Sequence, residues 1–369
     1  MSVGPLLFEP IFKPKIWGGR QLEQRLGRKL PPGEPIGESW EVADLEDDQS
    51  VVRAGPAKGK TLGALVKEWG KDLIGHAELF EGRFPLLIKF LDAHETLSVQ
   101  VHPDENTARK LGGRVRVKNE AWYILHAEGS GCIYRGLKPG VDATRLQTAL
   151  AEDHVESVLQ RINVRKGECY YLPSGTLHAL GAGVVVAEVQ TPSDITYRIY
   201  DWNRIDEQTG KPRDLHIEQA MECIAFDAPL IPQDRPHHVA GMWTTVTRLV
   251  LCESFMIERI RMVGGVEREI PHSEFVIWIM LEGQAAISYK GASQPLEILV
   301  GDTVLLPAGI QESRVHAIED ATWLEVSIPL SSDLAELEKL TGERASQPPA
   351  GGGGFVSLNV PKPHSNNEA

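Results

Sequence analysis

Residues able to do chemistry occur first between Thr96 and Asp104, in the run Thr-Leu-Ser-Val-Gln-Val-His-Pro-Asp. Side chains of a strand alternate between its two faces, so Ser98, Gln100 and His102 would share one face. The leucine and valines between them would form an apolar face against a core. This pattern predicts a strand whose polar side is the floor of a binding site. A half-buried edge strand with a wetted polar side is the alternative, because one histidine is a weak metal signal.

Further ionisable groups lie on other expected strands. Lys89 interrupts the apolar run 84–92, where a lysine either extends to solvent at an edge or points into a cavity. Lys118 and Glu120 begin the next apolar strand. His178 follows a stretch rich in glycine and proline, which predicts a tight turn that presents the imidazole at the start of a strand.

The composition is that of a globular protein, with 369 residues of which 42% are hydrophobic and 24% charged. The formal net charge of −13 argues against nucleic acid as a partner, since a phosphate backbone is bound through clustered Lys and Arg. A small anionic substrate needs only a local positive pocket, which the net charge does not forbid.

Signals for export or membrane insertion are not found in the sequence. Residues 1–15 contain no basic region followed by an apolar run, and no stretch of about 18 apolar residues occurs. We therefore expect a cytoplasmic protein with no membrane partner. Wide spacing without a C-x-x-C pair predicts reduced, mostly buried thiols at all four cysteines, which are Cys132, Cys169, Cys223 and Cys252.

Helical periodicity occurs in two segments of a chain otherwise rich in strand and turn patterns. Apolar residues at helical spacing predict one short helix within residues 61–76. A second helical pattern covers residues 142–162, with Asp142 as its N-cap.

An internal repeat gives the strongest indication of architecture. Residues 120–129 align with residues 274–283, and residues 167–175 align with residues 301–309. Both copies of the second segment end in Leu-Pro-small-Gly. Two copies of one strand-turn-strand unit, with a helical segment inserted only in the first, predict a mainly β fold of two tandem jelly-roll barrels.

Motif spacing points to a known family. The pattern G-x5-P-x-G-x2-H from Gly167 to His178 resembles the second motif of cupin barrels, although Ala182 stands where that motif has asparagine. Three other segments resemble the signatures of the type I mannose-6-phosphate isomerase family in its short bacterial form. They are residues 97–104, 118–123 and 193–204. The resemblance extends over residues 10–330.

The resemblance implies one divalent metal per chain, with zinc the expected ion and other divalent metals as alternatives. The implied ligands are Gln100, His102, Glu120 and His178. Imidazole nitrogens and a carboxylate are suitable zinc ligands, and such a set leaves a coordination position open. The neutral amide of Gln100 is a weaker ligand, for which a hydrogen bond to a true ligand is the alternative.

The implied activity is a metal-dependent aldose-ketose isomerisation between mannose 6-phosphate and fructose 6-phosphate through a cis-enediol(ate). This chemistry needs a base for the carbon-bound proton, stabilisation of the enediolate oxygens and an anchor for the phosphate. The catalytic candidates are Arg198, Lys118 and Glu188. The substrate-binding candidates are Ser98, Lys89 and Arg204. Glu188 and Lys118 both stay open as the base, and a solvated loop charge is the alternative role for Arg204.

Other functions are possible on the same fold. A non-catalytic cupin that binds a sugar phosphate, as a sensor or structural subunit, is the main alternative. An enzyme is favoured because the sequence contains every ligand candidate together with Arg198 and Lys118. A protein that only binds the sugar phosphate would not need both of these cations. An iron dioxygenase is disfavoured, since Gln100 stands where that class would have a histidine. The expected partner is a small sugar phosphate, and the expected state is a monomer or homodimer.

The expected domains are residues 1–235, a catalytic cupin domain with a helical insertion at about 140–162; residues 236–332, a cupin domain without metal; and residues 333–369, a helical end and disordered tail. The second domain is expected to lack metal because the repeat places Glu312 opposite His178 and Glu274 opposite Glu120, with only His272 preceding them. Apolar side chains would fill its interior, namely Phe275, Ile277, Ile279 and Leu305.

Overall fold

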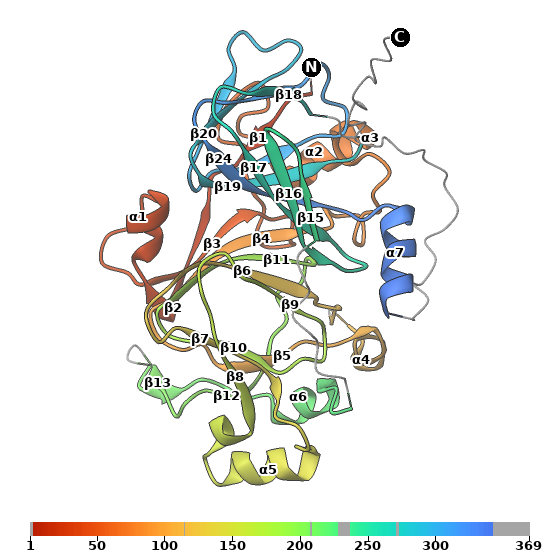
Figure 1. Cartoon of the computed structure of the whole chain (residues 1–369). Coiled ribbons are helices and arrows are strands. Elements are labelled where there is room, and N and C mark those ends of the chain that lie inside the picture. Colours follow the sequence, from red (N-terminus) through yellow and green to blue (C-terminus); the bar gives the residue numbers. More distant parts are fainter. Residues whose placement is uncertain (1–2, 114, 207–208, 228–236, 271–272, 342–369) are drawn as a thin grey trace, which may run out of the picture.

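The computed structural model describes residues 3–113, 115–206, 209–227, 237–270 and 273–341, and this part of the chain is mainly β (Figure 1). The mainly β class predicted from the sequence is therefore confirmed. No helix in these ranges is long and apolar enough to cross a membrane. All four cysteines are free thiols, and three of them are buried.

Two antiparallel sheets form the first half of the molecule. The six-stranded sheet has the order β2 (Ile11–Gly19), β3 (Ile36–Val42), β4 (Leu87–Ala93), β11 (Val184–Gln190), β6 (Glu120–Ala127) and β9 (Cys169–Leu172). The five-stranded sheet has the order β12 (Tyr197–Tyr200), β5 (Val99–Val101), β10 (His178–Leu180), β7 (Cys132–Leu137) and β8 (Leu159–Asn163). We call these two sheets the first sheet pair.

Two further antiparallel sheets form the second sheet pair. The seven-stranded sheet has the order β1 (Leu6–Leu7), β22 (Thr303–Leu306), β19 (Val276–Glu282), β24 (Ala321–Ser327), β17 (Met256–Met262), β16 (Thr244–Leu251) and β15 (His237–Ala240). The four-stranded sheet has the order β18 (Glu267–Glu269), β23 (Arg314–Ala317), β20 (Gln284–Ser288) and β21 (Leu296–Leu299). A short hairpin joins β13 (Ile205–Asp206) to β14 (Lys211–Pro212).

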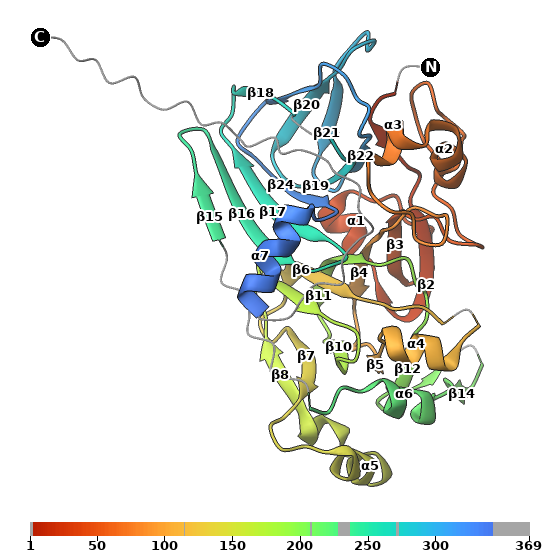
Figure 2. The same cartoon turned by 90° about the vertical axis from the view of Figure 1, so that its right-hand side faces the viewer.

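The helices lie mostly at the periphery. They are α1 (Gln21–Leu26), α2 (Leu62–Trp69), α3 (Lys71–Ile74), α4 (Glu105–Leu111), α5 (Ala143–Ala151), the 3-10 turn η1 (Val155–Val158), α6 (Ile217–Cys223) and α7 (Ser331–Thr341). Helix α5 lies at the end of the molecule remote from the second sheet pair, whereas α7 lies beside the seven-stranded sheet, where Glu336 pairs with Arg248 of β16 (Figure 2).

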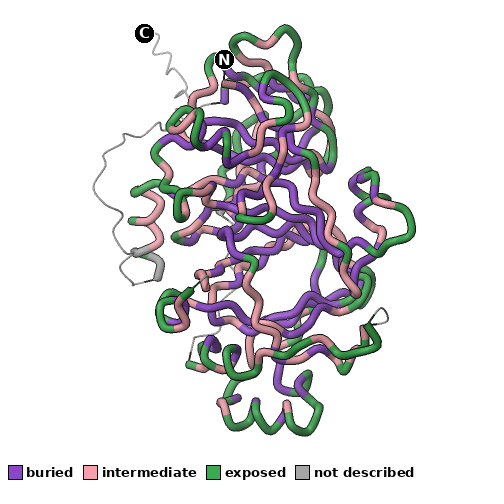
Figure 3. Tube along the Cα trace, turned by 180° about the vertical axis from the view of Figure 1, so that it is seen from behind, coloured by how far each residue is buried: buried purple, intermediate pink, exposed green. Residues whose placement is uncertain are grey.

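Three apolar cores hold the sheets in layers. One core lies within the first sheet pair and brings Trp122 of β6 together with Ile133 of β7. Another lies within the second sheet pair and joins Trp278 of β19 to Ile287 of β20. The largest core packs the six-stranded sheet against the seven-stranded sheet. Buried residues consequently run through the central strands, while exposed residues lie on outer loops and helices (Figure 3).

The side chains predicted to fill the second barrel face the other way. The sequence-based assignment is wrong for all four residues, because they belong to the core between the six- and seven-stranded sheets. They are Phe275, Ile277, Ile279 and Leu305. The interior of the second sheet pair is filled instead by their neighbours Val276, Trp278 and Met280. A strand has period two, so an error of one residue in choosing the buried face reverses every assignment.

The internal repeat is present, but its register differs by two residues from the sequence alignment. Leu172 of β9 faces Glu120 of β6, and its counterpart Leu306 of β22 faces Val276 of β19. Glu120 is therefore equivalent to Val276 rather than to Glu274. Glu274 instead accepts hydrogen bonds from the backbone of residues beyond α3, with a distance of 2.6 Å from the His76 nitrogen to Oε2.

Both predicted helices are shorter than expected. The helix within residues 61–76 is divided into α2 and α3, because Gly70 between them adopts φ 50° and ψ −120°. Asp142 caps α5 as predicted, accepting a 2.8 Å hydrogen bond from the backbone nitrogen of Arg145. Helix α5 nevertheless ends at Ala151, and the apolar residues beyond it belong to η1 and β8. Asp153, with φ 56°, turns the chain between them.

The domain boundaries expected from the sequence stay predictions. The expected junction at residue 235 and the expected disordered tail beyond residue 341 fall outside the described residues. One strand crosses the expected division, because β1 pairs with β22 through Leu6 and Leu305. The amino-terminal segment therefore helps to join the two sheet pairs.

Candidate metal centre and active site

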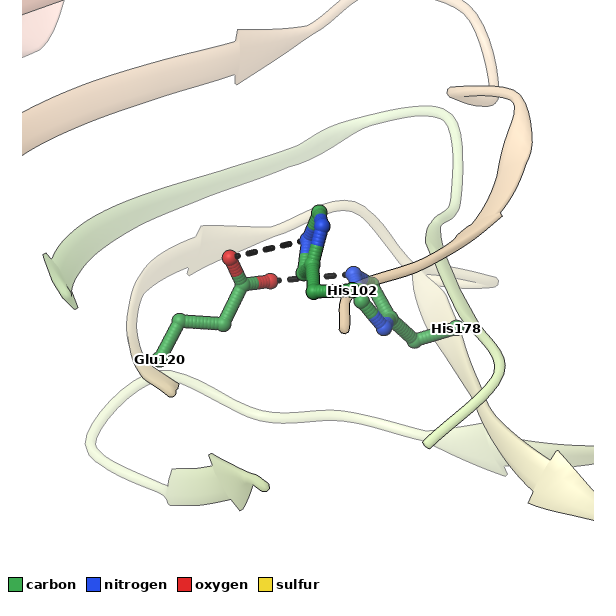
Figure 4. A group of neighbouring side chains, drawn as sticks. All are labelled: His102, Glu120 and His178. Atoms are coloured by element: carbon green, nitrogen blue, oxygen red, sulfur yellow. Dashed lines mark ion pairs between the residues drawn. The ribbon is translucent and has the colours of Figure 1, made fainter. Parts of the chain in front are cut away.

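Three buried side chains meet inside the first sheet pair. His102 follows β5, Glu120 begins β6 and His178 begins β10, and their ligand atoms all lie within 4.8 Å of one another (Figure 4). Nε2 of His102 is 3.3 Å from Oε2 of Glu120, and Nε2 of His178 is 3.0 Å from Oε1. Of the four ligands implied by the sequence, these three are brought together as predicted.

Local structure explains how the histidines reach the interior. Strand β5 is short, and its Val99 and Val101 pack outward in a core with α5 and α6, which leaves Gln100 between them on the opposite face. Leu97 does not share the face of these valines as predicted, because it precedes the strand and joins the interior core. On β10, Nδ1 of His178 donates a 2.8 Å hydrogen bond to a backbone carbonyl, so Nε2 is left as a ligand atom.

The protonation states of His102 and Glu120 suit a divalent cation. Burial, followed by the charge of Lys118, lowers the pKa of His102 to about 3, so its imidazole is neutral. Burial opposes ionisation of Glu120, but Lys118, His102 and His178 together hold its pKa well below the ordinary value. Both carboxylate oxygens, both nitrogens of His102 and Nε2 of His178 are buried without a hydrogen-bond partner in the described part of the chain. Imidazole nitrogens and an ionised carboxylate with unsatisfied lone pairs are the donor set of a metal site.

Gln100 and Lys118 lie beside this cluster. The Cα atom of Gln100 is opposite that of His178 on one side and that of Arg198 on the other. Metal coordination by its amide stays a prediction. The ammonium of Lys118 is buried, with Nζ 3.2 Å from Oε2 of Glu120.

Glu188 and Lys89 form a second charged group deeper between the sheets. Nζ of Lys89 lies 3.4 Å from Oε1 of Glu188 and 3.7 Å from Oε2 of Glu38. The indole of Trp122 donates a 2.9 Å hydrogen bond to Glu188. Burial, and then the charge of Glu120, raises the pKa of Glu188 above its usual value. Burial opposes the charged form of Lys89, but Glu188 and Glu38 raise its pKa further than burial lowers it. Lys89 therefore points into the interior, as one of the two sequence-based alternatives proposed.

The remaining candidates lie near β12 and the start of β5. Nη1 of Arg198 donates a 2.8 Å hydrogen bond to the backbone oxygen of Asp214. Arg204 lies on the turn after β12, where it pairs with Asp201 at 2.7 Å rather than remaining a free loop charge. Ser98 is buried next to β5. Their roles in substrate binding or catalysis stay predictions.

Several polar partners were missed by the sequence analysis. Glu38 accepts a 2.7 Å hydrogen bond from the indole of Trp40, and Lys15 lies 3.0 Å from its other oxygen. Burial opposes its ionisation, but Lys89 and Lys15 lower the pKa of Glu38 to about 2. The sequence signal was the carboxylate of Glu38 within the expected strand 36–42. Because this strand is buried in the structure, its carboxylate must be paired.

Comparison with known proteins identifies the family. Residues 6–128 match the model of the phosphomannose isomerase type I catalytic domain. The mannose-6-phosphate isomerase ManA of Bacillus subtilis is 35% identical over 317 residues, which are 86% of this chain and 97% of that protein. The chain belongs to the type I phosphomannose isomerase family. The mannose-6-phosphate isomerase of Streptococcus mutans is also 35% identical, over 83% of this chain and 93% of that protein.

Solved structures of mannose 6-phosphate isomerases share the fold. The crystal structure of the mannose 6-phosphate isomerase from Bacillus subtilis superposes with a TM-score of 0.79 at 34% identity, covering 88% of this chain and all of that one. A mannose 6-phosphate isomerase bound with zinc and yttrium has a TM-score of 0.68 at 15% identity, covering 89% of this chain. The family expected from the sequence motifs is thus confirmed, and with it an isomerase rather than a non-catalytic cupin.

Proposed function

We propose that this chain interconverts mannose 6-phosphate and fructose 6-phosphate with a zinc ion held by His102, Glu120 and His178. The observation that carries the proposal is the buried donor set of two imidazoles and one ionised carboxylate, in which both carboxylate oxygens, both nitrogens of His102 and Nε2 of His178 make no hydrogen bond among the described residues. Family membership supports the same activity, since the curated relatives are mannose-6-phosphate isomerases. Gln100 is a fourth ligand in this proposal.

When bound by His102, Glu120 and His178, a metal would supply positive charge that polarises or orients the sugar oxygens at C1 and C2. The other roles belong to the side chains around it. Glu188, a buried carboxylate fixed by Trp122 and Lys89, accepts the proton from C2 and returns it to C1. Its raised pKa brings it nearer to neutral pH, which suits a group that both takes and gives a proton.

Donor groups stabilise the enediolate oxygens in this mechanism. Lys118 lies against the metal-binding carboxylate and presents an ammonium at the same place. Arg198 stands next to Gln100 across the strand pair and presents a planar guanidinium with a fixed positive charge. Both charges are held before substrate arrives, and this preorganisation lowers the cost of forming an anion. Ser98 and Arg204 contact the sugar or its phosphate in this proposal, and Lys89 fixes Glu188 rather than touching substrate.

The test is a metal analysis of the purified protein combined with a coupled assay for fructose 6-phosphate formed from mannose 6-phosphate. One zinc per chain and turnover are expected. Chelation should abolish turnover, and added zinc or another divalent ion should restore it. Full turnover by protein verified to be free of metal would overturn the mechanism. Binding of mannose 6-phosphate without turnover by metal-loaded protein would favour the non-catalytic alternative.

The finer assignments are part of the same proposal. We place the metal in the first of two cupin domains, within residues 1–235, and expect a cytoplasmic monomer or homodimer. Small sugar phosphates are the expected partners.

A further inference from the structure

A charged turn follows β12 at the edge of the first sheet pair. Asp201 at its start is 6% exposed and holds two guanidinium groups. Nε and Nη2 of Arg213 donate to its two carboxylate oxygens at 2.8 and 2.6 Å, and Nη2 of Arg204 donates at 2.7 Å. Both arginine side chains are largely buried, at 15% and 20% exposure. Asp201 thus fixes two cations in one orientation, and they lower its pKa despite the opposing effect of burial.

The backbone of this turn is strained. Trp202 has φ 57° and Asn203 has φ 54°, and a 3.1 Å hydrogen bond from the Arg204 nitrogen to the Asp201 oxygen closes the turn. Asparagine tolerates the left-handed region, but a bulky indole side chain does so rarely. Such conformations persist where the surroundings fix them, and they are concentrated at functional sites.

The surroundings of Trp202 fix the strained turn to the site strand. Its indole nitrogen donates a 2.7 Å hydrogen bond to the backbone oxygen of Leu97, which immediately precedes Ser98. Its ring packs on those of Tyr134 and Tyr200, at centroid distances of 5.5 and 5.3 Å. The turn therefore cannot shift without moving the residues that lead into β5.

The helical insertion provides a second attachment. Asp153, which follows α5 and is itself left-handed, accepts hydrogen bonds from the hydroxyl of Tyr200 at 2.9 Å and from the amide of Asn203 at 2.5 Å. The insertion thus contacts the chain on both sides of Trp202. The inserted segment is therefore attached to the turn through Asp153.

Positive charge accumulates where the turn meets the site. Arg198, Arg204 and Arg213 are close enough that the last two, after burial, lower the pKa of Arg198. Asp201 is the one buried carboxylate in direct contact with this cluster in the described part of the chain, while Asp214 and Glu95 are exposed. The Nε atoms of Arg198 and Arg204 are buried with no hydrogen-bond partner in the described residues. Gathered guanidinium groups with unused donors, beside an interior metal cluster, match a phosphate dianion.

We propose that Arg213 is a positioning residue, which through Asp201 fixes Arg204 in the orientation that receives the substrate phosphate. This inference rests on the proposed function, which supplies a phosphorylated sugar as substrate. Arg213 donates two hydrogen bonds to Asp201, and it would act on the phosphate only through Arg204.

The experiment compares Arg213→Gln with Arg248→Gln in metal-loaded protein. Arg248 is a matched control, because it also makes a two-point pair with a carboxylate, at 2.9 and 2.8 Å, and is 18% exposed, but lies in the second sheet pair. Arg213→Gln should raise the KM for mannose 6-phosphate and the Kd for inorganic phosphate, measured by calorimetry, each by about tenfold. The kcat should change by less than about threefold, because the hydrogen bonds of Arg213 go to Asp201 and not to the proposed metal ligands or the proposed base. Arg248→Gln should change none of these values.

Two further measurements separate positioning from general damage. Arg213→Lys should recover part of the phosphate affinity, since it restores the charge but not the two-point contact. Asp153→Asn, at an exposed position, should weaken phosphate binding by about twofold to threefold through the strained turn without lowering the melting temperature. An unchanged KM and phosphate Kd in folded Arg213→Gln, or a fall in kcat alone, would overturn the inference. Phosphate binding that depends on Arg213 in a protein without turnover would support this anion site and count against the proposed function instead.

Discussion

In the first sheet pair a row of three side chains crosses β6, β11 and β4, and in the second an equivalent row crosses β19, β24 and β17. The first row is Trp122, Glu188 and Lys89, with Glu188 directly opposite each of the other two. The indole donates to the carboxylate and the ammonium lies 3.4 Å from it. This row is electrically paired, and it ends beside the metal cluster.

The second row is Trp278, Glu325 and Glu258, in the same register. A carboxylate therefore occupies the position that corresponds to Lys89. Burial, and then the charge of Glu325, raises the pKa of Glu258 to about 7. The indole nitrogen of Trp278 is buried with no hydrogen-bond partner in the described ranges, unlike that of Trp122. The second row keeps the tryptophan and the first carboxylate but lacks the cation.

The comparison shows how little of a shared fold decides its chemistry. Glu120, a metal-binding candidate, corresponds to Val276, which packs among apolar side chains. Lys89, which fixes the proposed base, corresponds to Glu258. The two sheet pairs thus share strand order and register here but differ in the side chains at these interior positions. Substitutions at these positions should separate the two sheet pairs experimentally.

The largest effect is expected from removing a proposed metal ligand in the first sheet pair. His178→Ala should lose bound zinc and at least about a hundredfold in kcat/KM, because even outer hydrogen-bond partners of metal ligands cost up to that much. Glu312→Ala should keep both metal and activity, since this residue is exposed and pairs with Lys290 at 2.9 Å. Metal content and the coupled assay measure both variants. Two tightly bound metal ions per chain, or inactivation of folded Glu312→Ala, would contradict the assignment of the metal to the first half.

A large effect on stability is expected at Lys89. Lys89→Met leaves Glu188 and Glu38 buried without their shared cation, so the free energy of unfolding should fall by about 3 to 5 kcal/mol. Lys60→Met is the control, because Lys60 pairs with Glu68 at the surface, where an ion pair contributes about 0 to 1 kcal/mol. Urea unfolding of both variants measures the difference. Equal, small losses would show that the first row does not need its cation.

The sequence predicted that His102, Glu120 and His178 lie together, but it did not predict which charged residues surround them. His102 and His178 each lie in a short motif that one strand or turn sets. Such a motif is recognisable in the sequence, and the family resemblance then implied that both histidines lie beside Glu120. The pairing of Glu38 with Lys89 depends on which strands are neighbours, and no local pattern specifies that.

Register was the second quantity that the sequence left undetermined. Glu120 and Glu274 both precede an apolar strand, which made a two-residue error in the repeat alignment invisible. Only the pairing of each strand with its neighbour reveals that Val276 takes the place of Glu120. Similarly, both faces of β19 are apolar because each meets a different core, so alternation could not show which face was interior.

The smallest of the three effects is a pH dependence of stability in the second row. The folded-state pKa of Glu258, about 7, lies above its ordinary value of 4.5. At pH values below the ordinary pKa, the carboxyl group of Glu258 is protonated in both the folded and the unfolded state. Its burial then does not lower the free energy of unfolding. As pH rises toward 7 the unfolded state ionises first, so this residue lowers the stability of the protein, by about 1.4 kcal/mol per pH unit. Arg248 and Arg268 oppose the shift, whereas Asp333 on α7 adds to it.

Glu258→Gln removes the ionisable group and should therefore stabilise the protein at pH 8 by about 2 to 3 kcal/mol, with no gain near pH 4.5. Glu282→Gln is the matched control, because Glu282 lies on β19 in the same sheet pair but has its pKa lowered, first of all by a hydrogen bond from Lys166. That variant should gain nothing at pH 8. Urea unfolding at the two pH values gives both comparisons. A loss of stability in Glu258→Gln at pH 8 would mean that Arg248 already neutralises this carboxylate, and that the second row is paired like the first.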